Sequence, residues 1–247
     1  MDFMLEADLH VHSLFSACGL HTILELLERG RAIGLKTMAI TDHGPGLGEG
    51  RLTSVFFERF RSPFPGINLF KGLELNVLPE RGKVDVVLQF MPFVDILLLG
   101  VHPNLKPGQS KDYYTDLTVA ALENNPFIDI LTHPNDTHYP LDYHVVAQTA
   151  KRLGMALELN NSKILYRRST AEEALLLIQA CKEVGCRMAV NSDTHALLEL
   201  GGDESVQPLL EKAGFPRELV VNRDAEAASA FIESRRELKR SAVQNRP

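Results

Sequence analysis

Short apolar runs alternate with longer amphipathic stretches along most of this chain. The apolar runs are four to six residues long and rich in aliphatic side chains, which predicts buried strands. They span residues 5–9, 36–41, 67–70, 94–99, 127–131, 156–159 and 187–190. The amphipathic stretches predict helices over residues 22–33, 112–123, 143–152, 171–184, 203–213 and 224–240. This alternation predicts repeated strand–helix units, and about seven strands indicate a (β/α) barrel.

Local signals support several of these boundaries. Thr22 is a candidate N-cap, and Glu25 three residues later completes a capping box. Gly34 supplies a stop before the second strand. Residues 44–66 are rich in glycine and aromatic side chains. This composition predicts a loop and one short helix, which would cover the functional site at the strand ends. Residues 241–247 are expected to form a frayed tail.

Length and composition fit one large α/β domain over residues 1–247, with no linker, internal repeat or low-complexity tract. The chain is 45% hydrophobic, and its 26 Lys and Arg against 32 Asp and Glu give a net charge of -6. That balance argues against a broad nucleic-acid surface but allows a small anionic substrate, because bound divalent cations would invert the local field. Three cysteines form no disulfide framework, and the chain shows neither a secretory signal nor a membrane-length apolar run. We expect a cytoplasmic protein without membrane contact.

Six polar clusters follow the apolar runs and hold eight side chains that can bind metal ions. These side chains are His10, His12, His43, Glu74, His102, His133, Asp193 and His195. Each alone has an ordinary structural explanation, such as a buried core histidine. In a (β/α) barrel, however, the carboxyl ends of the strands meet in one loop-walled site. The joint pattern therefore predicts an enzyme with a multinuclear metal site.

Spacing within two clusters supports shared ions. His10 and His12 lie two residues apart on a strand and share one face, so both can reach one ion or two adjacent ions. Asp193 and His195 repeat this spacing with a carboxylate in place of one imidazole. We expect Asp8 to orient one of the ligand imidazoles from behind.

The remaining clusters leave alternatives open. Glu74 lies between apolar neighbours, where it either bridges two cations or reaches the surface, because an unpaired buried carboxylate is costly. His102 and His133 each precede a proline, which favours the extended geometry of a strand exit. The glycine-rich segment 44–48 is either an ordinary turn or a close backbone approach to a ligand. Three histidines lie outside the pattern: His21, His138 and His144.

Taken in order, the clusters resemble the motifs of the PHP (polymerase and histidinol phosphatase) superfamily, and most of all its YcdX-like phosphatase branch. The motifs are Asp8-Leu9-His10-Val11-His12, Ile40-Thr41-Asp42-His43-Gly44-Pro45, Gly72-Leu73-Glu74, Gly100-Val101-His102, Thr132-His133-Pro134, Glu158-Leu159-Asn160-Asn161-Ser162 and Asn191-Ser192-Asp193-Thr194-His195. The resemblance covers roughly residues 5–240. It implies a distorted (β/α)7 TIM-like barrel with a trinuclear metal site, commonly zinc, that hydrolyses phosphoesters.

The resemblance also implies which side chains share each ion. One ion would be held by His10, His12, Glu74 and Asp193, and a second by Glu74, His102 and His133. The third would be held by His43, His195 and one further group. At that position the branch has a histidine, whereas this chain has Cys18, with His21 as the rival. The spacing from Cys18 to His43 needs no gap relative to the branch, which favours Cys18. Thiolate is a good zinc ligand, so the site could retain its metal, and manganese or iron are alternatives to zinc.

The remaining two cysteines, Cys181 and Cys186, lie on or near a predicted helix and are interpreted as packing residues.

The expected reaction is hydrolysis of a small phosphate monoester by a metal-bound hydroxide, with Asp193, Glu74 and His195 as the catalytic residues. Lys163 and Arg168 are either phosphate clamps or solvated loop charges. Two other functions stay open. One is a metal hydrolase of the amidohydrolase type, against which the lack of an evident ligand lysine argues. The other is a non-catalytic PHP domain that serves structure or partner binding. Assembly into a homo-oligomer is retained as an alternative to a monomer.

Overall fold

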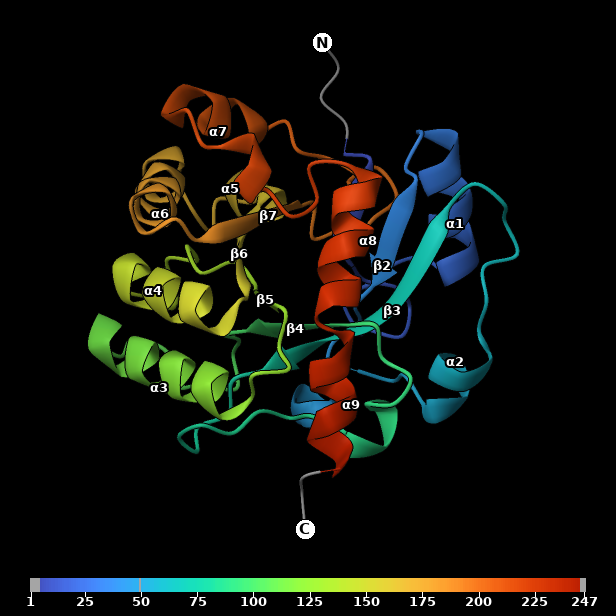
Figure 1. Cartoon of the computed structure of the whole chain (residues 1–247), viewed down its shortest axis with the longest axis horizontal. Coiled ribbons are helices and arrows are strands. Elements are labelled where there is room, and N and C mark those ends of the chain that lie inside the picture. The colour runs from blue at the N-terminus through green and yellow to red at the C-terminus, as the bar shows by residue number, and fades with distance from the viewer. Residues whose placement is uncertain (1–4, 49, 245–247) are drawn as a thin grey trace.

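In the computed structural model, which describes residues 5–48 and 50–244, the strands form one parallel sheet that curves into a nearly closed barrel (Figure 1). The strands are β1 (Ala7–Val11), β2 (Thr37–Ile40), β3 (Asn68–Asn76), β4 (Ile96–Gly100), β5 (Ile130–Leu131), β6 (Ala156–Asn160) and β7 (Arg187–Asn191). They are hydrogen-bonded in chain order, and a parallel bridge between Val11 and Thr194 joins the last strand to the first. The predicted distorted (β/α)7 barrel is confirmed.

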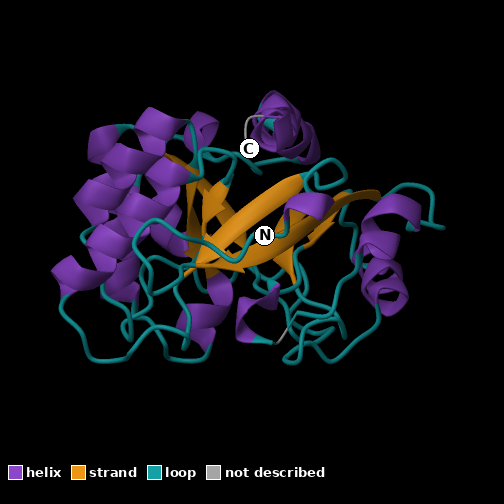
Figure 2. Ribbon diagram, turned by 90° about the horizontal axis from the view of Figure 1, so that it is seen from below, coloured by secondary structure: helices purple, strands orange, loops and turns teal. Residues whose placement is uncertain are grey.

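Helices cover the outside of the strands. They are α1 (Ile23–Ala32), α2 (Ser54–Arg59), α3 (Lys111–Asn124), α4 (Tyr143–Leu153), α5 (Asn161–Leu165), α6 (Ala171–Val184), α7 (Gln207–Ala213), α8 (Ala225–Ser234) and α9 (Arg236–Gln244). Helices α3, α4 and α6 stack on one side of the sheet, and α1 lies on the other (Figure 1). The C-terminal helices lie on one side of the strands, while loops gather on the opposite side (Figure 2). Within the described residues, no helix is long and apolar enough to cross a membrane.

The barrel interior has an apolar floor. Alternate strand residues such as Leu9, Leu98 and Ala189 form one buried cluster with Phe231 and Ile232 of α8. The other face of the strands packs against the surrounding helices in a second, larger cluster. Because α8 closes one end, the polar side chains of the strands collect at the other end.

The capping box of α1 is present as predicted. The Thr22 hydroxyl accepts a hydrogen bond from the Glu25 backbone, and the Glu25 carboxylate accepts one from the Thr22 backbone. Helices α3, α4 and α6 fall within one residue of their predicted bounds at each end. Between residues 44 and 66 the chain forms the 3-10 turn Pro45–Leu47 and the short helix α2.

Several predicted boundaries were wrong, and β1 covers Ala7–Val11 instead of residues 5–9. Strand β3 continues to Asn76 rather than stopping at residue 70, and β5 is reduced to Ile130–Leu131 from the predicted 127–131. The helix predicted over 203–213 begins only at Gln207, where a proline occupies the first turn. The run 224–240 is two helices, with a break at Arg235.

The predicted tail was also partly wrong, because residues 241–244 continue α9, whereas 245–247 lie outside the described residues.

Candidate metal centre

A β-bulge in β1 turns His10 toward the barrel interior. Asp8 pairs with Met38, but Val11 pairs with Ile40, so β1 has one residue more than β2 over this stretch. The extra residue lets Leu9 remain in the apolar floor while His10, the next residue, also enters the polar end. Regular alternation would have sent one of these two side chains outward.

Five imidazoles surround the carboxylate of Glu74. Its Oε2 lies 3.3 Å from His10 Nε2, 3.4 Å from His12 Nε2 and 3.1 Å from His43 Nδ1. Its Oε1 lies 3.2 Å from His102 Nε2 and 3.0 Å from His133 Nε2. Glu74 is almost completely buried and lies within β3, not past its end as predicted. The arrangement divides the histidines between its two oxygens, as a carboxylate that bridges two ions requires.

Asp193 faces the same group from the loop just after β7. Its Oδ1 lies 3.5 Å from His10 Nε2 and 3.3 Å from His12 Nε2. Its Oδ2 accepts hydrogen bonds from Lys163 Nζ at 2.6 Å and from Asn160 Nδ2 at 3.1 Å. The backbone of Asp193 has φ +56, a conformation that costs a non-glycine residue free energy and is concentrated at functional sites.

A second group of donors adjoins the first. Ligand atoms of His12, Cys18, His43 and His195 all lie within 4.8 Å of one another. His21, the rival of Cys18, instead lines a separate pocket with residues of α5 and the loop after β7. His138 pairs with Asp136 and His144 with Glu183, so both lie apart from the group, as predicted.

The carboxylates change the protonation of the histidines they face. Burial alone would lower the pKa of His12, but hydrogen bonds with Asp193 and Glu74 outweigh it and raise that pKa to about 9. Burial and the charge of His12 would likewise lower the pKa of His43, but hydrogen bonds with Cys18 and Glu74 outweigh both effects and raise that pKa to about 9. Two imidazoles therefore carry a proton at neutral pH when only protein atoms surround them.

Two other imidazoles shift the opposite way. Burial lowers the pKa of His102 to about 4, because the attraction of Glu74 does not compensate for it. Burial and the neighbouring charge of His12 lower the pKa of His195 to about 4. Both rings are neutral at pH 7 and carry a free nitrogen lone pair, the state that binds a metal ion.

The two carboxylates stay ionised. Burial raises the pKa of each, but His10 and His102 hold the pKa of Glu74 well below its usual range. Lys163 and His10 do the same for Asp193. Ionised carboxylates beside neutral and exchangeable imidazoles fit divalent cations, so the donor set suits a multinuclear metal centre.

Hydrogen bonds behind the candidate ligands fix their ring orientations. Glu158 Oε1 contacts His10 Nδ1 at 2.8 Å, and its Oε2 accepts a bond from the His133 backbone. Asn76 Oδ1 accepts from His102 Nδ1 at 2.6 Å. Each contact leaves Nε2 of the ring facing Glu74.

The sequence did not assign these supporting roles. Glu158 lies in the middle of the apolar run of β6, so a carboxylate inside a buried strand was the available signal. The prediction that Asp8 orients an imidazole was wrong. Its side chain bonds to the Ser192 hydroxyl and to the backbone of Gly201, because before the bulge it points out of the barrel.

Asp85 connects two of the ligand-bearing loops. Its Oδ2 accepts bonds from Asn76 Nδ2 and the Gly46 backbone, both at 2.7 Å, and its Oδ1 accepts from the Asn76 backbone at 2.6 Å. A Cβ on Gly44 would lie 2.4 Å from this carboxylate, and one on Gly46 2.7 Å from it. The glycine-rich segment after His43 is thus a close backbone approach, but to a side chain of the protein itself.

The two predicted phosphate clamps lie in different surroundings. Lys163 is held against Asp193, and although burial lowers its pKa, the charge of Asp193 raises it above the usual value. Arg168 is 41% exposed and pairs with Asp136 at 2.7 Å. The structure therefore brings Lys163, but not Arg168, into contact with a candidate ligand.

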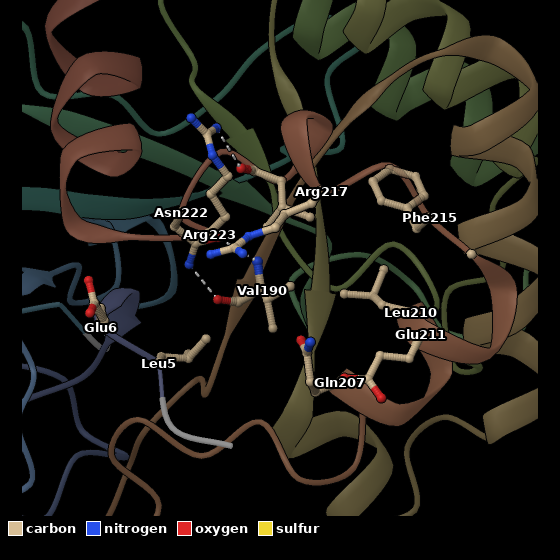
Figure 3. Close-up of a pocket in the computed structure, with 12 residues that line it drawn as sticks. Leu5, Glu6, Val190, Gln207, Leu210, Glu211, Phe215, Arg217, Asn222 and Arg223 are labelled. Atoms are coloured by element: carbon tan, nitrogen blue, oxygen red, sulfur yellow. Dashed lines mark hydrogen bonds between the residues drawn. The ribbon is translucent and has the colours of Figure 1, made fainter. Parts of the chain in front are cut away.

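A cavity of about 560 Å³ lies between β7 and α7, away from these groups (Figure 3). Arg217 and Arg223 line it together with the apolar side chains of Leu210 and Phe215. None of the predicted ligands is among its lining residues.

Comparison with known proteins shows similarity along most of the chain. The model of the PHP domain family matches residues 8–199, a span that contains all nine predicted ligands. The chain belongs to the PHP domain family. This PHP chain is 32% identical over 231 residues to a Shewanella frigidimarina protein named "probable phosphatase", covering 92% of the chain and 93% of that relative. It is 30% identical over 240 residues to a "probable phosphatase" of Caldanaerobacter subterraneus subsp. tengcongensis, covering 96% and 94%.

Solved structures confirm the barrel of this PHP domain. The histidinol phosphate phosphatase of Lactococcus lactis, solved with zinc, L-histidinol and phosphate, matches with a TM-score of 0.62. The match covers 85% of this chain and 94% of that one at 16% identity, so it bears on the fold. A phosphotriesterase homology protein of Escherichia coli matches with a TM-score of 0.55 and 11% identity, covering 94% of this chain and 100% of that one.

Proposed function

We propose that this PHP protein is a metal-dependent phosphoesterase that hydrolyses phosphate monoesters at a trinuclear site. The observation that carries the proposal is the group of five imidazoles around the single carboxylate of Glu74, next to the donor set of Cys18. The names of the full-length relatives support the reaction class.

We assign the candidate ligands to three positions. The first is formed by His10, His12, Glu74 and Asp193, and the second by Glu74, His102 and His133. The third is formed by Cys18, His43 and His195. His12 and His43 each lie near two positions, so either can complete a neighbouring one.

Divalent ions at these positions would lower the pKa of water from about 15.7 to roughly 7, and would neutralise the charge that gathers on the phosphoryl oxygens. The side chains of the protein would bind these ions and orient their ligands. Glu74 and Asp193 fix the positions with ionised oxygens, and Glu158 and Asn76 hold the imidazole rings in place. Lys163 stays protonated and places an ammonium group beside Asp193, where it can donate to a phosphoryl oxygen.

His195 is the most exposed imidazole of the proposed ligands and lies at the entrance to the group. Its Nδ1 contacts the Asp193 backbone carbonyl at 2.8 Å, which fixes the ring. We therefore keep Asp193, Glu74 and His195 as the catalytic residues: Glu74 would be shared by two positions, Asp193 would serve the first, and His195 would be a neutral donor at the entrance.

The test measures bound metal by mass spectrometry and compares hydrolysis of an aryl phosphate, an amide and a lactone by the same preparation. Three ions per chain with hydrolysis of the phosphate alone are expected. Preference for the amide or lactone would favour the amidohydrolase-type function. A metal-loaded protein that hydrolyses none of the three would favour a non-catalytic PHP domain.

Asp193→Asn is the matched variant. It keeps the shape of the side chain but removes the charge that faces His10, His12 and Lys163. We expect it to abolish turnover without changing the far-ultraviolet circular dichroism spectrum.

A further inference from the structure

The donor set around Cys18 differs in kind from the donor sets around Glu74. It consists of three imidazoles and one thiol, and contains no carboxylate. The other two sets, His10 with His12 and Glu74, and His43 with Glu74 and His102, each contain a carboxylate oxygen. One compact centre thus presents both sulfur-containing and oxygen-containing positions.

Sulfur and oxygen donors favour different metals. Thiolate ligands favour zinc and other soft ions, whereas carboxylate and water ligands suit manganese and magnesium. Imidazole binds both zinc and iron well, so the fourth donor determines which metal is preferred. Thiolate and imidazole are both established zinc donors, and four donors suit the tetrahedral coordination of zinc. The positions around Glu74 lack such a donor and accept either class.

The loop between β1 and α1 holds Cys18 at this place through its backbone. The Gly19 backbone donates to Ser16, and the Leu20 backbone donates to the carbonyl of His195 at 3.0 Å. A Cβ on Gly19 would lie 2.0 Å from the Ser13 carbonyl oxygen, so this turn requires glycine. The thiol is therefore placed by fixed backbone contacts and by its hydrogen bond with His43. The buried cysteines, Cys181 and Cys186, pack together away from the centre, as predicted.

We propose that the position formed by Cys18 with His12, His43 and His195 selects zinc against manganese, while the positions around Glu74 accept both. When both metals are supplied, the protein then binds a mixed set of ions with zinc beside Cys18. The inference rests on the metal centre of the proposed function, but it does not require that the protein hydrolyse phosphoesters.

The experiment uses the full chain, stripped with a chelator and reconstituted with zinc in the presence of excess manganese. Metal per chain is measured by mass spectrometry. A parallel sample is titrated with cobalt, because a cobalt–thiolate bond produces charge-transfer absorption that nitrogen and oxygen donors do not. The variants are Cys18→Ser and Cys18→His, with His21→Ala as the matched control from the same loop. Thermal unfolding of each stripped variant identifies any that fail to fold.

We expect the unmodified protein and His21→Ala to retain one zinc per chain in excess manganese and to show the charge-transfer band. Cys18→Ser should lose both, with zinc affinity at this position reduced by more than the 10–100-fold typical of changes behind a ligand. Cys18→His should bind three ions without the band and with weaker discrimination against manganese.

Absence of the band in the unmodified protein, or equal zinc retention in Cys18→Ser, would overturn the inference. Hydrolysis measured on the same samples separates the two proposals. A band without hydrolysis contradicts the proposed reaction alone, whereas hydrolysis without a band contradicts the inference alone.

Discussion

Lys163 and Arg168 are cations from one short segment, yet their surroundings differ. The Lys163 side chain is 12% exposed and pairs with Asp193, whereas that of Arg168 is 41% exposed and pairs with Asp136. A donor held in a buried site stabilises developing charge far better than one in water, because there is less screening and little reorganisation. Of the two, Lys163 has the surroundings of a group that contacts substrate.

We therefore expect Lys163→Ala to lower kcat/KM for an aryl phosphate by about 10²–10³, the usual cost of losing one such donor. Arg168→Ala should cost less than about tenfold, because its charge is more exposed. Steady-state kinetics at saturating metal separates loss of the donor from loss of an ion. Equal effects of the two substitutions would contradict the role of Lys163.

The raised pKa values of His12 and His43, both about 9, also give a prediction. Each imidazole is protonated below pH 9 in the metal-free protein, and a metal ion binds only the neutral ring. Metal uptake at pH 7.5 should therefore release protons, and affinity should rise as the pH increases toward 9. Calorimetry in buffers of different ionisation enthalpy measures this release. Uptake without proton release at pH 7.5 would show that neither ring is a ligand or that neither is protonated.

At the scale of elements, the bulge in β1 and the length of β3 determine which side chains meet. Sequence alternation identified the strands and most of the candidate ligands, because polar residues after apolar runs are visible without a structure. It did not reveal the bulge, which depends on pairing with β2, and so it misplaced Asp8. Glu158 and Asn76 were not assigned because their partners come from other strands.

Asp85 lies beyond the short hairpin marked by the bridge between Val77 and Val84, and it holds both Asn76 and the loop after His43. Asp85→Ala should free both contacts and weaken metal binding by about 10–100-fold, with kcat lowered in parallel. Asp85→Asn should recover part of the loss, since its oxygen still accepts one bond. Metal titration followed by kinetics measures both effects, with exposed Glu80→Ala as the control. An Asp85→Ala variant with unchanged affinity would exclude a positioning role.

At the scale of the whole molecule, a buried ion cluster closes the barrel opposite the metal centre. Asp129 accepts from Arg235 Nε at 2.9 Å and from Lys239 Nζ at 2.7 Å, and all three side chains are at least 95% buried. The guanidinium of Arg235 also donates to the backbone carbonyls of Leu153, Gly154 and Ile128. Arg235 lies at the break between α8 and α9, so the contacts that end α8 also attach the C-terminal helices to the strands.

Removing Asp129 would leave two cations buried without their counter-charge. We expect Asp129→Ala to lower the free energy of unfolding by about 3–5 kcal/mol. Lys36→Ala, which breaks an exposed pair with Glu6, should cost less than about 1 kcal/mol. Urea denaturation measures both values. A similar small loss for the two variants would mean that the cluster does not hold the barrel closed.

The alternation of strands and helices made the barrel predictable, whereas its closure was not. Val11 meets Thr194 across most of the chain, and Asp129 meets Arg235 across 106 residues. No local pattern encodes such contacts. The same limit applies to the break in 224–240, where the sequence is continuously helical and a distant carboxylate attracts Arg235.

The central claim is that nine side chains, from six strands and the loops that follow them, hold three ions. Anomalous X-ray diffraction at the zinc absorption edge, on crystals of the zinc-loaded protein, tests it most directly. We expect three peaks, with Glu74 between two of them and Cys18 Sγ about 2.3 Å from the third. Fewer than three peaks within reach of these side chains, or a third peak coordinated by His21 instead of Cys18, would contradict the account.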